Sequence, residues 1–597
     1  MTAETKLSAA RAQPATPSTP ATSSAKADPV TVEVIKRRLV AIADHMDLNI
    51  TRTAFSLLVS EYKDYAVGIV DGEGLLLCQS TAGMPLFIAD VLGAAVRDGL
   101  KVYGPDGFEE GDIVISNDIG QHLNNVAMYT PVFDTGSGSR GRPVAFVVVV
   151  MHWVDIGGRG LGSTSRFATD IWQEGLLINT VKLYSAGKLN AEVQRIIRTN
   201  SRLPEELMGD IDAQIGACYM GRDGVAGILG KYGLAVFRQC VEAMWDQGER
   251  ASRKAIAAIP DGIYSADAFM DDDGLNRGKP IPLKVKVIIK GEEMTVDLSE
   301  LPKETKSSIN AGASGGGQSV ARLGFRYAVL PEGHANEGTF RPLKLVLPEG
   351  NIMNCGPTAA RSYYNLALPT LIDLVIKSLA PAIPDRVAGG HYGTFSSVRF
   401  RGSKPGMQPG KSTAFQCAES GFGGWGALSD SDGPGPFRTM CHGDTRLIPI
   451  EAQEAEFPIL FESMALRTDS GGAGEFRGGL GMTKKYRVLG PCEFSVSVDR
   501  TACPPWGING GAAAKGGGAS ITKADGSTGE VLKEVSMMDA GDRVTIWTGG
   551  GGGYGEPAKR SLERLKADIS CGYVSREAAE RDYGAVFDEQ LNIVGRK

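Results

Sequence analysis

Glycine is the feature that most limits how this chain can fold. The sequence has 78 glycines in 597 residues, roughly twice the usual share of about 7%. They cluster in runs such as "GGG", "GGLG" and "GGGGG", without a collagen-like period. Aperiodic glycine clusters are typical of tight turns and of backbone segments that approach each other closely. The sequence therefore predicts close backbone contacts between β-strands rather than a fibrous repeat.

Composition and charge argue against several classes of binding partner and structural site. Hydrophobic residues make up 42% of the chain and charged residues 22%, which suits a globular protein with a sizeable core. The net charge is −6 and the basic residues are scattered, so we expect neither nucleic acid nor an anionic membrane as the main partner. No apolar run approaches the length of a membrane span. The nine cysteines form no CxxC pair, which argues against a zinc ribbon and predicts reduced thiols in the cytoplasm.

Hydrophobic periodicity predicts the order of the elements. The Ala-, Thr-, Ser- and Pro-rich residues 1–29 predict a disordered tail, neither signal peptide nor core. The expected elements are an amphipathic helix over 29–56 with His45 on its surface, β-structure over 65–152 with a hairpin at Asp71-Gly72, mainly helix over 164–256, strands from 260 with helical inserts near 319–330 and 368–380, β-structure over 455–555, and a terminal helix within 575–587.

This order is neither a βαβ repeat nor a solenoid. It predicts the α+β class, with large antiparallel or mixed sheets, a helical segment in the N-terminal half and a Gly-rich β part at the C-terminal end. The predicted regions are the tail 1–29, an α+β region 30–260, a central α+β region 261–400 and a Gly-rich β region 401–597 with the terminal helix.

Three short stretches carry side chains that bind divalent metals. "SEYKDYAVGI" contains Glu61 and Asp64, "QHLNN" contains His122 with Asn125 three residues later, and "MHWVDIGG" contains His152 with Asp155 three residues later. Imidazoles and carboxylates that converge from adjacent strand ends can hold a metal ion. The alternative is a pair of buried histidines that are hydrogen-bonded within a core. The spacing alone leaves both interpretations open.

Other motifs indicate structure rather than chemistry. "GASGGGQS" and "TGGGGGYGEP" lack the Gly-Lys-Ser/Thr ending of a phosphate-binding loop, so we interpret them as structural turns and expect no ATP site on this chain. No Gly-x-Ser-x-Gly elbow is present. Cys355 and Cys417 have no nearby base and are interpreted as buried or inert thiols. The alternation from His442 to Glu456 is compatible with a solvated strand edge.

Several stretches resemble the B-type subunit of the hydantoinase B/oxoprolinase family over about residues 30–597. They are "SEYKDYAVGIVDGEG", "NDIGQHLNNVAMYTPVF", "MHWVDIGGRGLGS", "WQEGLLI", "LPEGNIMNCGP", "DSGGAGEFRGGLG", "PPWGINGG", "TGGGGGYGEPAKR" and "VSREAAERDYGAVF". The resemblance implies a large α+β subunit that works with an A-type partner of actin-like fold, with extra small subunits in some members. That partner binds ATP and phosphorylates a carbonyl oxygen of the substrate, and the B-type subunit acts on the activated intermediate.

The family's metal site, carried over by position, falls on Asp64, His122, Asn125 and His152. Three positions match, but Asn125 stands where the family has an aspartate, so one negative charge is missing. An amide oxygen still binds hard cations but competes poorly for zinc. The resemblance leaves zinc and manganese as the possible metals. Asp155 could replace the missing carboxylate ligand or could orient His152. Asp64, His122 and His152 are the predicted catalytic residues.

The missing charge bears on the reaction that we predict. In an amide hydrolase, the missing charge would weaken metal binding and so the activation of the metal-bound water. A ketone carboxylase can instead use the histidines as acid, base or oxyanion-binding groups without a metal. The sequence therefore favours carboxylation of a ketone, as in acetophenone or acetone carboxylases. ATP-dependent opening of a cyclic amide, as in hydantoinases, oxoprolinases and lactamases, is the alternative. A non-catalytic scaffold subunit is the third hypothesis.

Overall fold

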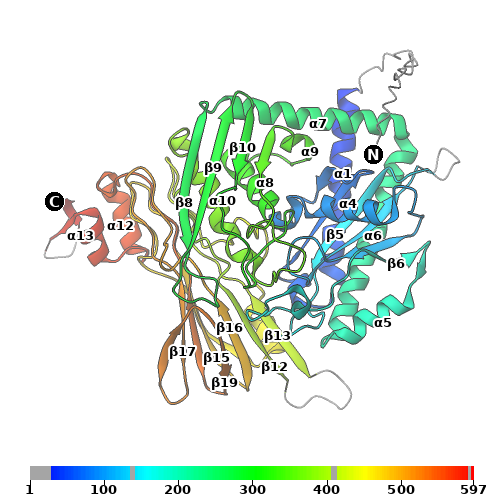
Figure 1. Cartoon of the computed structure of the whole chain (residues 1–597). Coiled ribbons are helices and arrows are strands. Elements are labelled where there is room, and N and C mark those ends of the chain that lie inside the picture. The colour runs from blue at the N-terminus through cyan, green and yellow to red at the C-terminus, as the bar shows by residue number, and fades with distance from the viewer. Residues whose placement is uncertain (1–27, 135–140, 405–412, 589–592, 597) are drawn as a thin grey trace, which may run out of the picture.

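The computed structural model describes residues 28–134, 141–404, 413–588 and 593–596 (Figure 1). The predicted tail lies outside these ranges as far as residue 27. Asp28 is already ordered as the N-cap of helix α1 (Pro29–Thr53), where its carboxylate accepts the backbone N–H of Thr31 at 2.9 Å. An aspartate at this position satisfies one of the free N–H groups of the first turn. The opening helix that the sequence predicted is confirmed.

The N-terminal sheet has seven antiparallel strands in the order β2-β1-β5-β4-β3-β6-β7. The strands are β1 (Tyr65–Asp71), β2 (Leu76–Gln79), β3 (Ile113–Ser116), β4 (Asn125–Val132), β5 (Ala145–His152), β6 (Val181–Ser185) and β7 (Lys188–Leu189). The predicted hairpin at Asp71-Gly72 joins β1 to β2. Alternate residues of β5 enter two different hydrophobic cores, with Val148 in one and Val149 in the other. Burial on both faces explains why this strand is apolar at every position.

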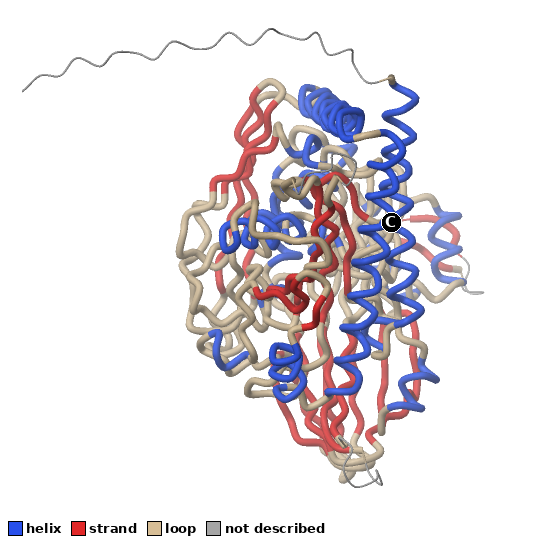
Figure 2. Tube along the Cα trace, turned by 90° about the vertical axis from the view of Figure 1, so that its right-hand side faces the viewer, coloured by secondary structure: helices blue, strands red, loops and turns tan. Residues whose placement is uncertain are grey.

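Helices surround this sheet. They are α4 (Val91–Tyr103), α5 (Ala191–Asn200), α6 (Pro204–Tyr232) and α7 (Leu234–Ala257), with the single turns α2 (Leu57–Ser60) and α3 (Pro85–Ile88) near the start of the chain. α4 and α6 pack against the strands, whereas α5 packs against α6, and α7 against α1 and α9 (Glu337–Phe340). The prediction of β-structure over 65–152 was wrong for 85–103, which holds α3 and α4. Helices α1 and α6 pack side by side and against the strands, and Figure 2 shows them along one side of the molecule. The prediction of helix over 164–256 was wrong for 164–190, which holds β6, β7 and a 3-10 turn at Ile171–Glu174. β6 pairs with β3, a long-range contact that local periodicity does not reveal.

The central region has a four-stranded sheet in the order β11-β10-β9-β8. Its elements are β8 (Gly262–Met270), β9 (Ile281–Lys290), β10 (Glu293–Asp297), α8 (Gly317–Ala328), α9 (Glu337–Phe340), β11 (Leu343–Val346) and α10 (Leu368–Ser378). Both predicted helical inserts are present, as α8 and α10, and they pack against each other. This sheet shares its core with one face of the N-terminal sheet.

The C-terminal region contains two further sheets, in the orders β13-β12-β16-β19 and β14-β15-β20-β17-β18. Their strands are β12 (Ser397–Ser403), β13 (Ala414–Glu419), β14 (Ile459–Leu466), β15 (Met482–Val488), β16 (Cys492–Ser497), β17 (Gly518–Thr522), β18 (Thr528–Val531), β19 (Lys533–Met538) and β20 (Arg543–Trp547). They share one apolar core, so they form a sandwich. The boundaries proposed near 260 and 400 stay predictions; β12 runs across the second, and residues 405–412 near it lie outside the described ranges.

The chain closes with a small helical unit. It comprises α12 (Leu562–Ser570), α13 (Arg576–Tyr583), β21 (Ala585–Phe587) and β22 (Ile593–Arg596), which have a core of their own (Figure 1). The predicted terminal helix is confirmed as α13, with Ser575 as its N-cap and Gly584 at φ 67° as its C-cap. None of the helices in the described part of the chain has the length and apolar content that a membrane span needs.

The clustered glycines pack backbone against backbone. Gly551 donates to the carbonyl of Gly479 at 2.9 Å, and Gly552 donates to that of Gly390 at 2.8 Å. A Cβ added to Gly551 would lie 1.8 Å from the carbonyl oxygen of Trp425. The run "TGGGGGYGEP" is therefore structural, as predicted, because its glycines leave no room for side chains. We call residues 389–393, 421–427, 471–481, 507–517 and 549–555 the glycine layer.

The prediction of a solvated strand edge from His442 to Glu456 was wrong. His442 is buried, with its ring 3.8 Å from that of Phe395, and Ile450–Glu456 form helix α11. The four acidic residues of this stretch made it look exposed. Packing by the distant Phe395 overrides that local signal.

Candidate functional site

The ends of three neighbouring strands bring the predicted residues together. Asn125 begins β4 and lies directly opposite His152, the last residue of β5. The backbone N–H of His152 donates to the carbonyl of Asp64, 3.0 Å away, just before β1 begins. Adjacent strands lie about 4.8 Å apart, so these side chains are neighbours. His122 lies three residues before Asn125 and completes the group.

Both imidazoles contact the same amide oxygen. Nε2 of His122 lies 2.9 Å and Nδ1 of His152 lies 3.1 Å from Oδ1 of Asn125. The two imidazole rings are 4.9 Å apart between centroids. The amide nitrogen of Asn125 donates to Oε1 of Gln121 at 2.8 Å and to the hydroxyl of Tyr364 at 3.3 Å. These two acceptors orient the amide so that its oxygen faces the histidines.

Burial sets the protonation of the site. Burial and the charge of Arg399 lower the pKa of His122 to about 4. The pKa of His152 lies well below its ordinary value because of burial, His122 and Arg399. Burial raises the pKa of Asp64 to about 7, although Arg438 and Arg399 oppose the shift. Near neutral pH the site therefore holds two neutral imidazoles and a carboxyl group that can give or take a proton.

The donor types fit a divalent cation. Neutral imidazole nitrogens and a carboxylate are ligands that zinc and manganese accept. Asp64 Oδ2 lies 3.9 Å from Nδ1 of His152. Within the described ranges, no three His, Cys, Asp or Glu side chains are close enough to hold a metal ion on their own. A metal held by Asp64, His122 and His152 would thus need the amide oxygen of Asn125, and it stays a prediction.

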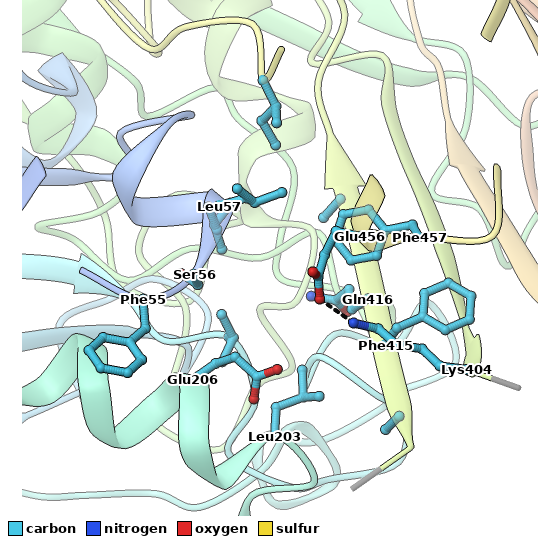
Figure 3. A pocket seen from close by; sticks show the side chains of 15 residues that line it. Phe55, Ser56, Leu57, Leu203, Glu206, Lys404, Phe415, Gln416, Glu456 and Phe457 are labelled. Atoms are coloured by element: carbon cyan, nitrogen blue, oxygen red, sulfur yellow. Dashed lines mark hydrogen bonds and ion pairs between the residues drawn. The ribbon is translucent and has the colours of Figure 1, made fainter. Parts of the chain in front are cut away.

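The site opens on a small cavity and an apolar pocket. The cavity, about 40 Å³, is lined by Asp64, His152 and Arg399 among others. It adjoins a pocket of about 180 Å³, and Leu58 and Ala418 line both. Figure 3 shows this pocket between the start of α6 on one side and β13 on the other, with an ion pair of Lys404 and Glu456. Its side chains are otherwise mostly apolar: Phe55, Leu57, Leu58, Val154, Leu203, Phe415, Ile448 and Phe457.

Other residues that the sequence singled out lie away from the two histidines. The carboxylate of Asp155 pairs with Arg202 at 2.6 Å and accepts the backbone N–H of Gly162. Among the described contacts it does not touch the imidazole of His152, so its predicted support is indirect, through the loop after β5. Glu61 ends α2 and does not line the cavity. Cys417 is buried, as predicted, whereas Cys355 is half-buried.

Sequence reasoning missed four residues around the site. Gln121 and Tyr364 orient Asn125, Arg399 lines the cavity, and Tyr62 lies beside it with its hydroxyl 3.3 Å from Nε2 of His442. Gln121 is adjacent to His122 in the sequence and was within reach of local reasoning. Tyr364 and Arg399 come from segments more than 200 residues away, for which the spacing gives no signal.

Comparison with known proteins shows which proteins the chain resembles. The chain is 31% identical to the caprolactamase beta subunit of Pseudomonas jessenii, over 94% of this chain and 96% of that protein. It is 29% identical to a Pseudomonas protein assigned as the B-type subunit of a D-/L-hydantoinase, over 95% and 97% of the two chains.

Solved structures agree on the fold. The ATP-dependent caprolactamase from Pseudomonas jessenii superposes with a TM-score of 0.86 at 28% identity, over 95% of this chain and 98% of that one. Acetone carboxylase, in its nucleotide-free form, superposes with a TM-score of 0.83 over 95% and 81%; its 19% identity supports the fold alone. Residues 28–557 match the family described as hydantoinase B/oxoprolinase. The chain belongs to the hydantoinase B/oxoprolinase family.

Proposed function

We propose that this chain is the B-type subunit of an ATP-dependent enzyme that opens a cyclic amide. An A-type partner binds ATP and phosphorylates the carbonyl oxygen, and this chain hydrolyses the activated intermediate. The observation that carries the proposal is the convergence of His122, His152 and Asp64 beside an apolar pocket. The similarity to a caprolactamase and a hydantoinase subunit over nearly the whole chain supports the cyclic-amide class.

In this proposal the pocket binds the ring of the substrate and the cavity holds its reacting carbonyl group. The apolar pocket of about 180 Å³ suits the hydrocarbon part of a small ring. The carbonyl carbon then lies beside Asp64 and His152, where a water molecule can attack it and pass its proton to one of these side chains. A divalent ion held by Asp64, His122, Asn125 and His152 would lower the pKa of such a water. Burial of the histidines restricts the access of other water to the intermediate.

Carboxylation of a ketone is the second candidate, and Asn125 is the observation that favours it. The amide oxygen of Asn125 lies within hydrogen-bond distance of one ring nitrogen of each histidine, and the amide carries no charge. A site that joins an enol carbon to CO2 must exclude water and needs no metal-bound hydroxide.

The test is reconstitution of this chain with an A-type, ATP-binding partner subunit. The complex is given ATP and, separately, a hydantoin, 5-oxoproline, a lactam, or a ketone with labelled bicarbonate. Ring-opened product formed in proportion to ADP supports the proposal. Label fixed into an acid from the ketone, with no ring opening, would replace it by carboxylation.

A further inference from the structure

One face of strand β12 points towards the site. Val398 and Phe400 lie in the apolar core of the sandwich, so Arg399 between them points to the opposite side. It pairs directly with Ala418 of β13 and with Ser495 of β16. Residues opposite each other in antiparallel strands share a face of the sheet. Arg399, Ala418 and Ser495 therefore share one face of the sheet, and Arg399 and Ala418 line the cavity together with Asp64 and His152.

Two guanidinium groups meet at this face around one phenol. The Cζ atom of Arg166 lies 4.5 Å and that of Arg399 lies 5.5 Å from the ring centre of Tyr363. Arg399 also donates to the hydroxyl of Tyr363 at 3.3 Å. Burial alone would raise the pKa of Tyr363, but the charges of Arg399, Arg166 and the nearby Arg401 lower it. The local potential is thus strongly positive.

Among the described residues no carboxylate lies within ion-pair distance of Arg166 or Arg399, although Asp272 acts on Arg166 and Asp64 acts on Arg399 at longer range. Arg401 is paired with Glu493 at 3.3 Å. Glu419, which also lines the cavity, is paired with Lys484 at 2.8 Å. Stacking on a phenol offsets only part of the cost of burying a guanidinium without a counter-charge. An anion from outside the chain, bound at close range, would supply the counter-charge that this face lacks within ion-pair distance.

Unpartnered polar atoms lie at the same place. Nε of Arg166 and the hydroxyls of Ser495 and Ser497 are buried and have no hydrogen-bond partner in the described part of the chain. Arg166 is 3% exposed and Ser495 is 3% exposed. Buried polar groups of this kind usually have a partner. A ligand with several acceptor oxygens would provide one.

We propose that Arg399, Arg166 and Ser495 form an oxyanion subsite that binds the phosphoryl group of the activated intermediate and then the inorganic phosphate formed from it. This inference rests on the proposed function, because a phosphorylated intermediate must reach this chain. Arginine forks match the oxygens of a phosphoryl group. Arg399 lines the same cavity as His152, so an intermediate whose phosphoryl group is bound by Arg399 would have its carbonyl carbon near the acid and base groups.

The first experiment measures binding of inorganic phosphate to the full chain alone, by calorimetry, without the ATP-binding partner. We expect one phosphate per chain, with affinity reduced at least tenfold in Arg399→Met and about threefold in Ser495→Ala. Arg487→Met, on β15 and paired with Glu462, is the matched control and should bind like the parent. Circular dichroism shows whether each variant is folded, and the Ser495→Ala change is small enough to keep the test valid if Arg399→Met does not fold.

The second experiment separates this inference from the proposed function. In the two-subunit complex, Arg399→Met should raise the inhibition constant for phosphate at least tenfold and lower kcat, with Arg399→Lys recovering part of both. Unchanged phosphate binding and inhibition in Arg399→Met and Ser495→Ala would overturn the subsite while leaving ring opening intact. Binding of bicarbonate or acetate in preference to phosphate would also overturn it, because the subsite would then serve a carboxyl group.

Discussion

His152 and Asn125 lie opposite each other on β5 and β4, with Nδ1 of His152 3.1 Å from Oδ1 of Asn125. This contact makes Asn125→Asp the most informative change for the metal. A carboxylate between two imidazoles should raise the affinity for zinc or manganese roughly ten- to a hundredfold. Elemental analysis after dialysis against a chelator measures it, with Asn125→Ala as control. An aspartate variant with no more metal than the parent would contradict the predicted ligand set.

The same variant should be less stable. An aspartate at this position cannot donate to Oε1 of Gln121 as the amide of Asn125 does, and leaving a buried acceptor without a donor costs about 1–3 kcal/mol. Thermal unfolding in the presence of a chelator checks this loss. Adding the metal should restore part of it, because a ligand that binds only the folded state stabilises it.

Replacing either imidazole should separate two activities of the complex. We expect His152→Ala to lower product formation at least about a hundredfold, because it removes an acid or base group, while ATP hydrolysis by the partner continues in part. Product and ADP are measured in the same reaction. His45→Ala, on the exposed surface of α1, is the control. Full activity in both His122→Ala and His152→Ala would favour a scaffold role.

Leu58 should control which substrates reach the site, because it lines both the pocket and the cavity. Leu58→Trp would fill the passage and should lower kcat/KM by tenfold or more, with larger rings affected most. Leu58→Ala should shift preference towards rings larger by one methylene group by about 10- to 200-fold, the range for one methylene in an apolar pocket. Leu48→Trp, at a site 44% exposed, is the control. An equal loss for all ring sizes would point to general damage.

Glu174 should make the stability depend on pH. Burial raises its pKa from 4.5 to about 7, although the N–H groups of Ser362 and Arg361, which donate to it, oppose the shift. Since the folded pKa is the higher one, the stabilising effect of the protonated form is complete below about pH 4.5. It is lost as the pH rises through about 7.

Glu174→Gln keeps an acceptor for both N–H groups and cannot ionise. Relative to the parent, it should therefore gain up to about 3 kcal/mol between pH 4.5 and 8. Urea unfolding at several pH values measures the difference. A difference that does not change with pH would mean that Glu174 titrates normally in the folded chain.

The glycine layer should tolerate no side chain at its centre. A Cβ at residue 551 would overlap the carbonyl of Trp425, so Gly551→Ala should cost at least about 3 kcal/mol, the upper range for overpacking. Gly529→Ala is the matched control, since nothing lies within 4 Å of its added Cβ. Comparable unfolding midpoints for the two variants would argue against close packing at residue 551.

Local patterns predicted helices α1, α6, α7, α8, α10 and α13 and the buried strands, but not helices α4 and α11, which lie in segments predicted as β-structure. The apolar run that ends at His152 specifies a strand covered on both faces, and the caps at Asp28, Ser575 and Gly584 mark helix ends. The pairing of β6 with β3 and the burial of His442 could not be predicted in this way. Both depend on partners far away in the sequence, and their contact energy outweighs local preference.

The site was predicted as far as its residues lie at adjacent strand ends. Asp64, Asn125 and His152 are neighbours because β1, β5 and β4 pair in register. Arg399 and Tyr364 come from other parts of the fold, and their approach depends on how the C-terminal sandwich docks against the first sheet. The effect of Asn125 was also hidden, because its two acceptors, Gln121 and Tyr364, become visible only in three dimensions.

The glycine layer also constrains how the protein is made. Gly551 to Gly553 hydrogen-bond to Gly479, Gly390 and Ala512, so this segment joins parts of the chain that leave the ribosome long before it does. Until residue 555 has emerged, the earlier glycine segments can pair only with one another, as Gly389 does with Ala427 and Gly479 with Trp425, and they have little apolar surface with which to collapse. The glycine layer is thus completed only near the end of synthesis, and translation that stops before this point should yield an aggregation-prone fragment.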